Sequence, residues 1–133
     1  MSKYIKDISG ETPDIETYLY VKDYISKYQL NIDINSKPLK DQIIEINTLL
    51  KFHDNSESKK KSHFEITYST VIKLNKEIKD KNILQKIVLC DVQKEVYPDM
   101  EKALLYLLHN SGYPEIKFEK KVDFEGLYKK NFN

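Results

Sequence analysis

The chain has 133 residues, which suits one domain, and its 22 basic and 21 acidic residues leave a net charge of only +1. Proteins that bind nucleic acids through phosphate contacts usually carry a strong basic excess, so this balance argues against nucleic-acid binding. The single cysteine, Cys90, excludes an internal disulfide and a cysteine-based metal cluster. No apolar run reaches the roughly 18 residues of a membrane span, and the N-terminus lacks a signal-peptide core, so we expect a cytoplasmic protein without membrane insertion.

The first part of the chain predicts strands. Polar and apolar residues alternate roughly over residues 3–9 and more clearly over residues 28–34, 44–52 and 63–74. In the last two segments one face holds isoleucine, leucine and aromatic residues, whereas the other holds mainly polar ones. Consecutive strands that each have one apolar face predict an antiparallel sheet that is covered on one side only.

A tyrosine-rich stretch separates the first two of these segments. Tyr18, Tyr20, Tyr24 and Tyr28 follow neither a clear helical nor a clear strand period, so residues 15–28 are interpreted as a long connection that ends in a strand. Two roles for these tyrosines stay open. They can cover the edge of the core, or they can line a groove, because tyrosine combines a large apolar ring with a polar tip.

The C-terminal third predicts helices. Apolar residues recur at helical spacing over residues 83–108, and Pro98 within this run predicts a kink, since proline removes a backbone hydrogen bond. Gly112 suits the left-handed position that ends a helix. Asp123 is a good N-cap for a short closing helix, whose apolar stripe would extend to Phe132.

The apolar stripe of the long helix is broader than the surface helix of one subunit needs. The run AlaLeuLeuTyrLeuLeu at residues 103–108 is its most apolar part. We therefore expect a second chain to cover some of it, and we expect the protein to be a homo-oligomer. The expected interface residues are Val92, Val96, Met100, Leu104 and Leu108.

The chain lacks the sequence patterns of an enzyme. Its three glycines are too sparse for a phosphate-binding loop, and no nucleophile motif surrounds a serine. His53, His63 and His109 do not have the spacing of metal ligands, although the first two flank a predicted hairpin loop. We therefore expect no catalysis, cofactor or metal. A sheet followed by a long apolar helix indicates binding or assembly.

Five segments, in the same order along the chain, resemble the SecB family of export chaperones. Residues 4–13, YIKDISGETP, resemble the family's opening Tyr-x-Lys-Asp-Ile-Ser-x-Glu-x-Pro, and residues 21–24, VKDY, resemble Gln-Lys-Asp-Trp. Residues 96–98, VYP, stand where the family has Leu-Phe-Pro. Residues 112–114, GYP, resemble Gly-Phe-Pro, and residues 122–128, VDFEGLY, resemble Val-Asn-Phe-Asp-Ala-Leu-Tyr.

This resemblance implies an α+β fold and a function. A four-stranded antiparallel sheet would carry a long kinked helix and a short closing helix on one face, as one SecB-like domain over residues 1–133. SecB-like proteins assemble as dimers of dimers, hold unfolded precursor proteins in apolar grooves without ATP, and deliver them to the translocation motor SecA. The resemblance therefore implies a homotetramer whose partners are unfolded precursors and SecA.

The resemblance also implies sites. The expected client-binding groove consists of Tyr18, Tyr20, Tyr24, Tyr113, Phe118, Phe124, Leu127 and Tyr128. The expected SecA-type docking residues are Asp7, Glu11 and Glu65, because acidic residues of the family's exposed sheet face contact that partner.

Two departures from the family pattern bear on the partner. Thr67 stands where the family has a second acid after Glu65, and the near-zero net charge predicts weak electrostatic steering toward a basic partner. Two alternatives therefore stay open. The chain can be a SecB-like chaperone dedicated to one partner, such as an antitoxin, or a non-chaperone assembly or immunity protein.

Overall fold

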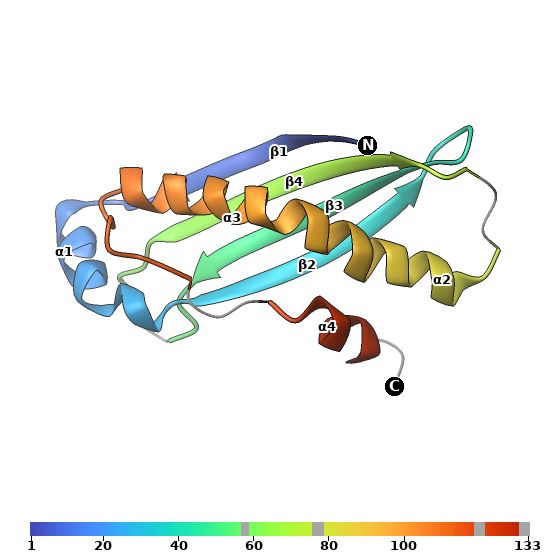
Figure 1. The fold of residues 1–133 in the computed structure, drawn as a ribbon. Helices are drawn as coiled ribbons and strands as arrows, with labels where there is room; N and C mark the ends of the chain where they lie inside the picture. The colour runs from blue at the N-terminus through green and yellow to red at the C-terminus, as the bar shows by residue number, and fades with distance from the viewer. Residues whose placement is uncertain (57–58, 76–78, 119–121, 131–133) are drawn as a thin grey trace.

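A four-stranded antiparallel sheet carries one long helix across a single face (Figure 1). The computed structural model describes residues 1–56, 59–75, 79–118 and 122–130. The strands are β1 (Ser2–Glu11), β2 (Gln29–Pro38), β3 (Ile43–His53) and β4 (His63–Lys73), and they lie in the order β1-β4-β3-β2. The α+β fold and the antiparallel sheet predicted from the sequence are confirmed.

Strands β3 and β4 form the centre of the sheet because their alternating residues match in register. Leu50 lies opposite Ile66 and Phe52 lies opposite Phe64, and all four side chains are buried. A strand directs successive side chains to opposite faces, so this register places both apolar sets beneath the helix. We call the helix-covered side the inner face and the opposite side the outer face.

Strand β2 is longer than the sequence predicted, because it continues to Pro38 instead of turning after Ile34. The turn to β3 is tight. Within the four-residue connection 39–42, Asp41 and Gln42 both have left-handed backbone angles, with φ of 61° and 64°, and the Ile43 N–H donates to the Lys40 carbonyl at 3.3 Å across them. The strand order β1-β4-β3-β2 makes β1 and β2 the two edges of the sheet.

The prediction for residues 15–28 was wrong. Instead of an irregular connection, this stretch forms helix α1 (Ile15–Tyr24) and a 3₁₀ turn, η1 (Ile25–Lys27). The Asp14 side chain caps α1 by accepting a hydrogen bond of 2.7 Å from the Thr17 backbone N–H. Within α1 and η1 the buried residues, Thr17, Val21 and Ile25, recur at i+4 spacing, so Tyr18, Tyr20 and Tyr24 lie outside the main buried stripe, whereas Tyr28 is buried.

The long helix continues through Pro98 without a break. It consists of α2 (Lys81–Lys86), a π-helical segment η2 (Ile87–Asp91) and α3 (Val92–Asn110). The helix departs from regular α geometry in η2, upstream of the proline. No helix in the described part of the chain is long and apolar enough to cross a membrane.

The stripe expected to join subunits lies instead in the core of this one. Val92 is 6% exposed and the remaining members of the stripe are fully buried, because they point at the inner face of the sheet. Since these side chains are already covered, they are not available to a second chain. The interface prediction therefore needs correction for all five residues, Val92, Val96, Met100, Leu104 and Leu108.

Gly112 ends the long helix as predicted. Its φ is +104°, the Tyr113 N–H donates to the Leu108 carbonyl, and the Tyr18 hydroxyl donates to the Gly112 carbonyl at 3.0 Å. A side chain at this position would also collide with the Tyr18 ring. The closing helix, α4 (Phe124–Lys130), begins at the predicted cap, Asp123, whereas the expected extension to Phe132 lies outside the described residues.

Candidate functional site

A groove of about 780 Å³ lies between strand β2 and the C-terminal segment. Apolar side chains from both sides line it, with two lysines and two aspartates among them. The lining residues are Leu30, Asn31, Ile32, Asp33, Lys117, Phe118, Val122, Asp123, Gly126, Leu127 and Lys130. We call this cavity the β2 groove.

The free edge of β2 is one side of the groove. Four consecutive residues, 30–33, line it, although Leu30 and Ile32 belong to the inner face and Asn31 and Asp33 to the outer face. Side chains of both faces can border one groove only along the edge between them. Within the described residues no strand pairs with this edge, so its outward backbone N–H and C=O groups make no strand-to-strand hydrogen bond.

Helix α4 is the other side, and it is fixed to the long helix. Phe124 is buried against Tyr97, with ring centroids 5.4 Å apart and nearly perpendicular planes. Burial raises the pKa of Tyr97 to about 12. Lys94 Nζ lies 2.7 Å from Glu125 Oε1 and holds the pKa of that carboxyl below its ordinary value.

The predicted groove residues of the C-terminal segment have different roles. Phe118 and Leu127 line the β2 groove, and Phe118 also packs edge-on against Phe52 at 5.6 Å. Phe124 does not line it, because its ring is turned into the contact with the long helix. Tyr128 is half-buried and donates a hydrogen bond of 3.3 Å to a carbonyl of α2.

The predicted groove tyrosines of the N-terminal half do not line the β2 groove. Tyr20 and Tyr24 are 37% and 42% exposed on α1, and their ring centroids are 4.7 Å apart. Tyr18 packs against Tyr113, at 5.5 Å between ring centroids. Tyr20 and Tyr24 thus form a separate exposed aromatic surface, whereas Tyr18 and Tyr113 have structural contacts.

A buried hydroxyl cluster explains the position of Tyr113. Its hydroxyl lies 3.1 Å from Ser62 Oγ, which is 2.7 Å from Thr12 Oγ1, and the Ser62 backbone N–H donates to the Tyr28 hydroxyl at 3.0 Å. Burial raises the pKa of Tyr28, so its phenol stays protonated in this cluster. The cluster joins the end of β1, the start of β4 and the segment after the long helix.

The three predicted docking acids lie together on the outer face. In the β1–β4 register, Asp7 lies opposite Thr67 and Glu11 lies opposite His63, with Glu65 between these positions on β4. Asp7 and Glu11 are exposed. Glu65 is partly covered, and its carboxylate lies 2.6 Å from His63 Nε2.

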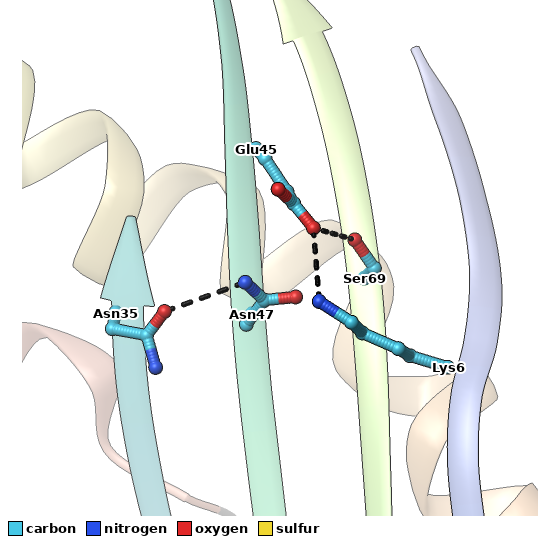
Figure 2. Close-up of polar contacts among 5 residues, drawn as sticks. All are labelled: Lys6, Asn35, Glu45, Asn47 and Ser69. Carbon is cyan, nitrogen blue, oxygen red and sulfur yellow. Dashed lines mark hydrogen bonds and ion pairs between the residues drawn. The ribbon is translucent and has the colours of Figure 1, made fainter. Parts of the chain in front are cut away.

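The centre of the outer face is polar and charge-paired (Figure 2). The Glu45 carboxylate accepts hydrogen bonds from Lys6 Nζ at 3.3 Å and from Ser69 Oγ at 3.4 Å. The Lys6 ammonium holds the pKa of Glu45 below its ordinary value. Beside this pair, Asn47 donates to the Asn35 side chain at 3.4 Å. A binding partner would therefore meet a face with little unpaired charge at its centre.

An apolar strip lies where β1 passes beside α3. Ile5 and Ile8 belong to the inner face but are each 45% exposed, because the long helix covers the middle of the sheet and leaves this edge open. The flank of α3 that faces β1 is marked by an ion pair between Lys3 and Asp99. The same flank carries Tyr106, which is 71% exposed.

The described residues hold no cluster of three or more side chains that suits a metal ion, and Cys90 is a buried free thiol. The structure therefore offers a groove and two contrasting surfaces. The sequence prediction missed Leu30 and Ile32 as groove residues and Ile5 and Ile8 as exposed apolar residues. Their alternation was visible, but alternation alone does not show which strands are edges.

The comparisons with known proteins agree with this architecture. The family model for preprotein translocase subunit SecB matches residues 1–133. A relative from Pelagibacter ubique (strain HTCC1062) that bears the SecB name is 56% identical over 133 residues, covering 100% of this chain and 95% of that one. The protein-export protein SecB of Bartonella quintana (strain Toulouse) is 23% identical over 130 residues, covering 98% and 80% of the two chains.

A solved structure supports the fold. The SecB-like chaperone of Mycobacterium tuberculosis, in complex with a peptide from an antitoxin, aligns with a TM-score of 0.61. The alignment covers 92% of this chain and 86% of that one at 6% identity.

The family match, together with the fold, places the chain in the export-chaperone class. The chain belongs to the SecB family, which is a family of protein-export chaperones and not of enzymes.

Proposed function

We propose that the protein is an ATP-independent holdase that binds unfolded precursor proteins in the β2 groove. The observation that carries this proposal is the open edge of β2 beside an apolar cavity of about 780 Å³. An extended chain can add to a free edge through backbone hydrogen bonds, which require no particular sequence. Apolar side chains of the client would then contact Leu30, Ile32 and Leu127.

The chemistry of the groove suits unfolded chains. Burial of apolar side chains from water drives association, and it requires no strict shape complementarity when the client is flexible. A protein that binds only the unfolded state withholds it from aggregation by mass action. The exposed pair Tyr20 and Tyr24 on α1 offers a second apolar surface for a long client.

The test is aggregation of an unfolded client in the absence of nucleotide. The parent protein should suppress light scattering by a chemically unfolded precursor. Ile32→Asp places a charge in the groove and should abolish the suppression, whereas Leu39→Asp, at an exposed turn, should not. A folded parent protein that leaves aggregation unchanged would disprove the holdase function.

We also propose that subunits associate through the apolar strip of Ile5, Ile8 and Tyr106, as a dimer that assembles into a tetramer. This strip replaces the buried stripe as the candidate interface. It is exposed, it is apolar, and it adjoins β1, whose free edge can pair with the same strand of a second copy. The β2 groove lies at the opposite edge of the sheet and would stay open in such a dimer.

We further propose that the outer face docks SecA. Asp7 and Glu11 are exposed acids on one face, which suits a basic partner segment. However, Glu65 already lies beside His63 at 2.6 Å and Lys51 at 4.0 Å, so steering by charge is weaker than three free acids would give. The alternative of one dedicated client is favoured by the structural neighbour, which was solved with an antitoxin peptide.

A further inference from the structure

The contact between the long helix and the sheet contains a fully buried amide. Gln93 has no exposed surface, and its partner on β3, Thr48, is 1% exposed. The surrounding contact consists mainly of aliphatic and aromatic side chains, such as Leu50 and Val96. A buried amide destabilises the fold unless its hydrogen bonds are satisfied, so this residue needs an explanation beyond packing.

Both ends of the Gln93 side chain are satisfied, and they join two different elements. Its Oε1 accepts a hydrogen bond of 3.0 Å from Thr48 Oγ1 on the sheet. Its Nε2 donates a hydrogen bond of 3.3 Å to the Val88 carbonyl in the π-helical segment. The same amide therefore fixes the sheet and the helix with respect to one another.

The π-helical segment makes the second bond possible. In a regular α-helix the Val88 carbonyl would accept from the Val92 N–H, but here that N–H donates to Ile87. The Val88 carbonyl can therefore accept from the Gln93 side-chain amide instead. A leucine at residue 93 would give up both bonds, and sliding the helix by one residue would remove Gln93 from Thr48.

The segment that Gln93 fixes also holds α4. Lys94, the next residue, pairs with Glu125, and Tyr97, one turn further, packs against Phe124. The described ion-pair and aromatic contacts of α4 go to the long helix. One side of the β2 groove is therefore part of the sheet, while the other side is attached to the long helix, so the placement of that helix on the sheet bears on the distance between the two sides.

We propose that Gln93 is a positioning residue that sets the width of the β2 groove by fixing the long helix on the sheet. It does not contact a client. The effect on client binding rests on the proposed function. The role of Gln93 in placing the long helix rests only on its contacts with Thr48 and Val88. An apolar residue of equal size would fill the same space without specifying the register.

The test uses a variant of nearly the same shape. Gln93→Met keeps the length of the side chain and removes both hydrogen bonds, and Thr48→Val removes only the bond to the sheet. Spin labels at Lys37→Cys on β2 and Lys129→Cys on α4, in a Cys90→Ala background, report the distance across the groove. A second pair, at Lys37→Cys and Lys73→Cys, lies within the sheet and serves as the control.

In both variants the distance distribution across the groove should broaden, while the control distribution stays unchanged. Affinity for an unfolded client should fall about tenfold if only about a tenth of the subunits keep the native register. An unchanged distribution across the groove in Gln93→Met and in Thr48→Val would overturn the inference. If the parent binds no unfolded client, the holdase function fails, but the distance measurement still decides the role of Gln93.

Discussion

The attachment of α4 gives the sharpest prediction, because one side chain dominates it. Phe124 is 4% exposed and packs against Tyr97, which is 7% exposed. Beside this ring contact lie an exposed ion pair, Lys94 with Glu125, and the hydrogen bond from Tyr128 to α2, while Leu127 and Tyr128 pack only partly against the core. We therefore expect Phe124→Ala to detach α4 while the sheet and the long helix stay folded.

The magnitude follows from the burial of the ring. Truncating a buried phenylalanine to alanine destabilises by about 3–5 kcal/mol. A neutral hydrogen bond contributes about 1 kcal/mol, and an exposed ion pair contributes little, so the remaining contacts do not compensate for the loss. A loss of about 3 kcal/mol lowers the ratio of attached to detached α4 by about two powers of ten.

Hydrogen exchange with mass spectrometry measures this ratio. Amide protons of residues 124–130 should exchange about 100-fold faster in Phe124→Ala, if exchange in the parent occurs through detachment. Amides of β3 and β4 should keep their protection. Affinity for an unfolded client should fall, because the groove loses one side. Phe124→Leu is the control and should give an intermediate rate. Unchanged exchange over residues 124–130 in Phe124→Ala would refute the assigned role of the ring.

Three further outcomes concern assembly, pH and docking. Ile8→Asp should lower the mass measured by light scattering, and Leu39→Asp should not; equal masses would place the interface elsewhere. The pKa of Glu125 is lowered from 4.5 by its lysine partner, so this pair stabilises α4 above about pH 4.5 and is lost as pH falls through the lowered pKa. Glu125→Gln should remove that acid-induced increase in α4 exchange. Glu11→Gln should weaken binding of a basic SecA segment more than Glu65→Gln, because Glu65 is already paired; the reverse order would contradict this assignment.

The central strands could be predicted because their burial follows the simplest pattern. Burial alternates strictly over residues 44–52, because β3 lies between two strands and the long helix covers its inner face. Helix α1 was missed because four tyrosines obscured the period of the buried residues. The useful signals were Asp14 at the cap position and the i+4 spacing of Thr17, Val21 and Ile25.

The site could be predicted only in part, because exposure depends on the order of the strands. The helix stripe from Val92 to Leu108 was correctly identified as apolar but assigned to the wrong contact. The periodic spacing of apolar residues shows that one face of a helix is covered. It does not show whether the sheet of the same subunit or a second chain covers it. Phe118 and Leu127 were assigned to a groove through the family resemblance, whereas Leu30 and Ile32 required knowledge that β2 is an edge.

The open edge of β2 has a consequence for self-association. A strand added to a free edge presents a new free edge, so such pairing can continue into fibre-like polymers. Helix α4 limits this process because it forms the far side of the groove. A strand added to β2 would lie about 4.8 Å from it, and α4 would stand in the way of a further strand on its new edge. Pro38 ends the strand and lacks a backbone donor. Under the proposed function, the β2 edge would therefore accept one client strand, and pairing would end there.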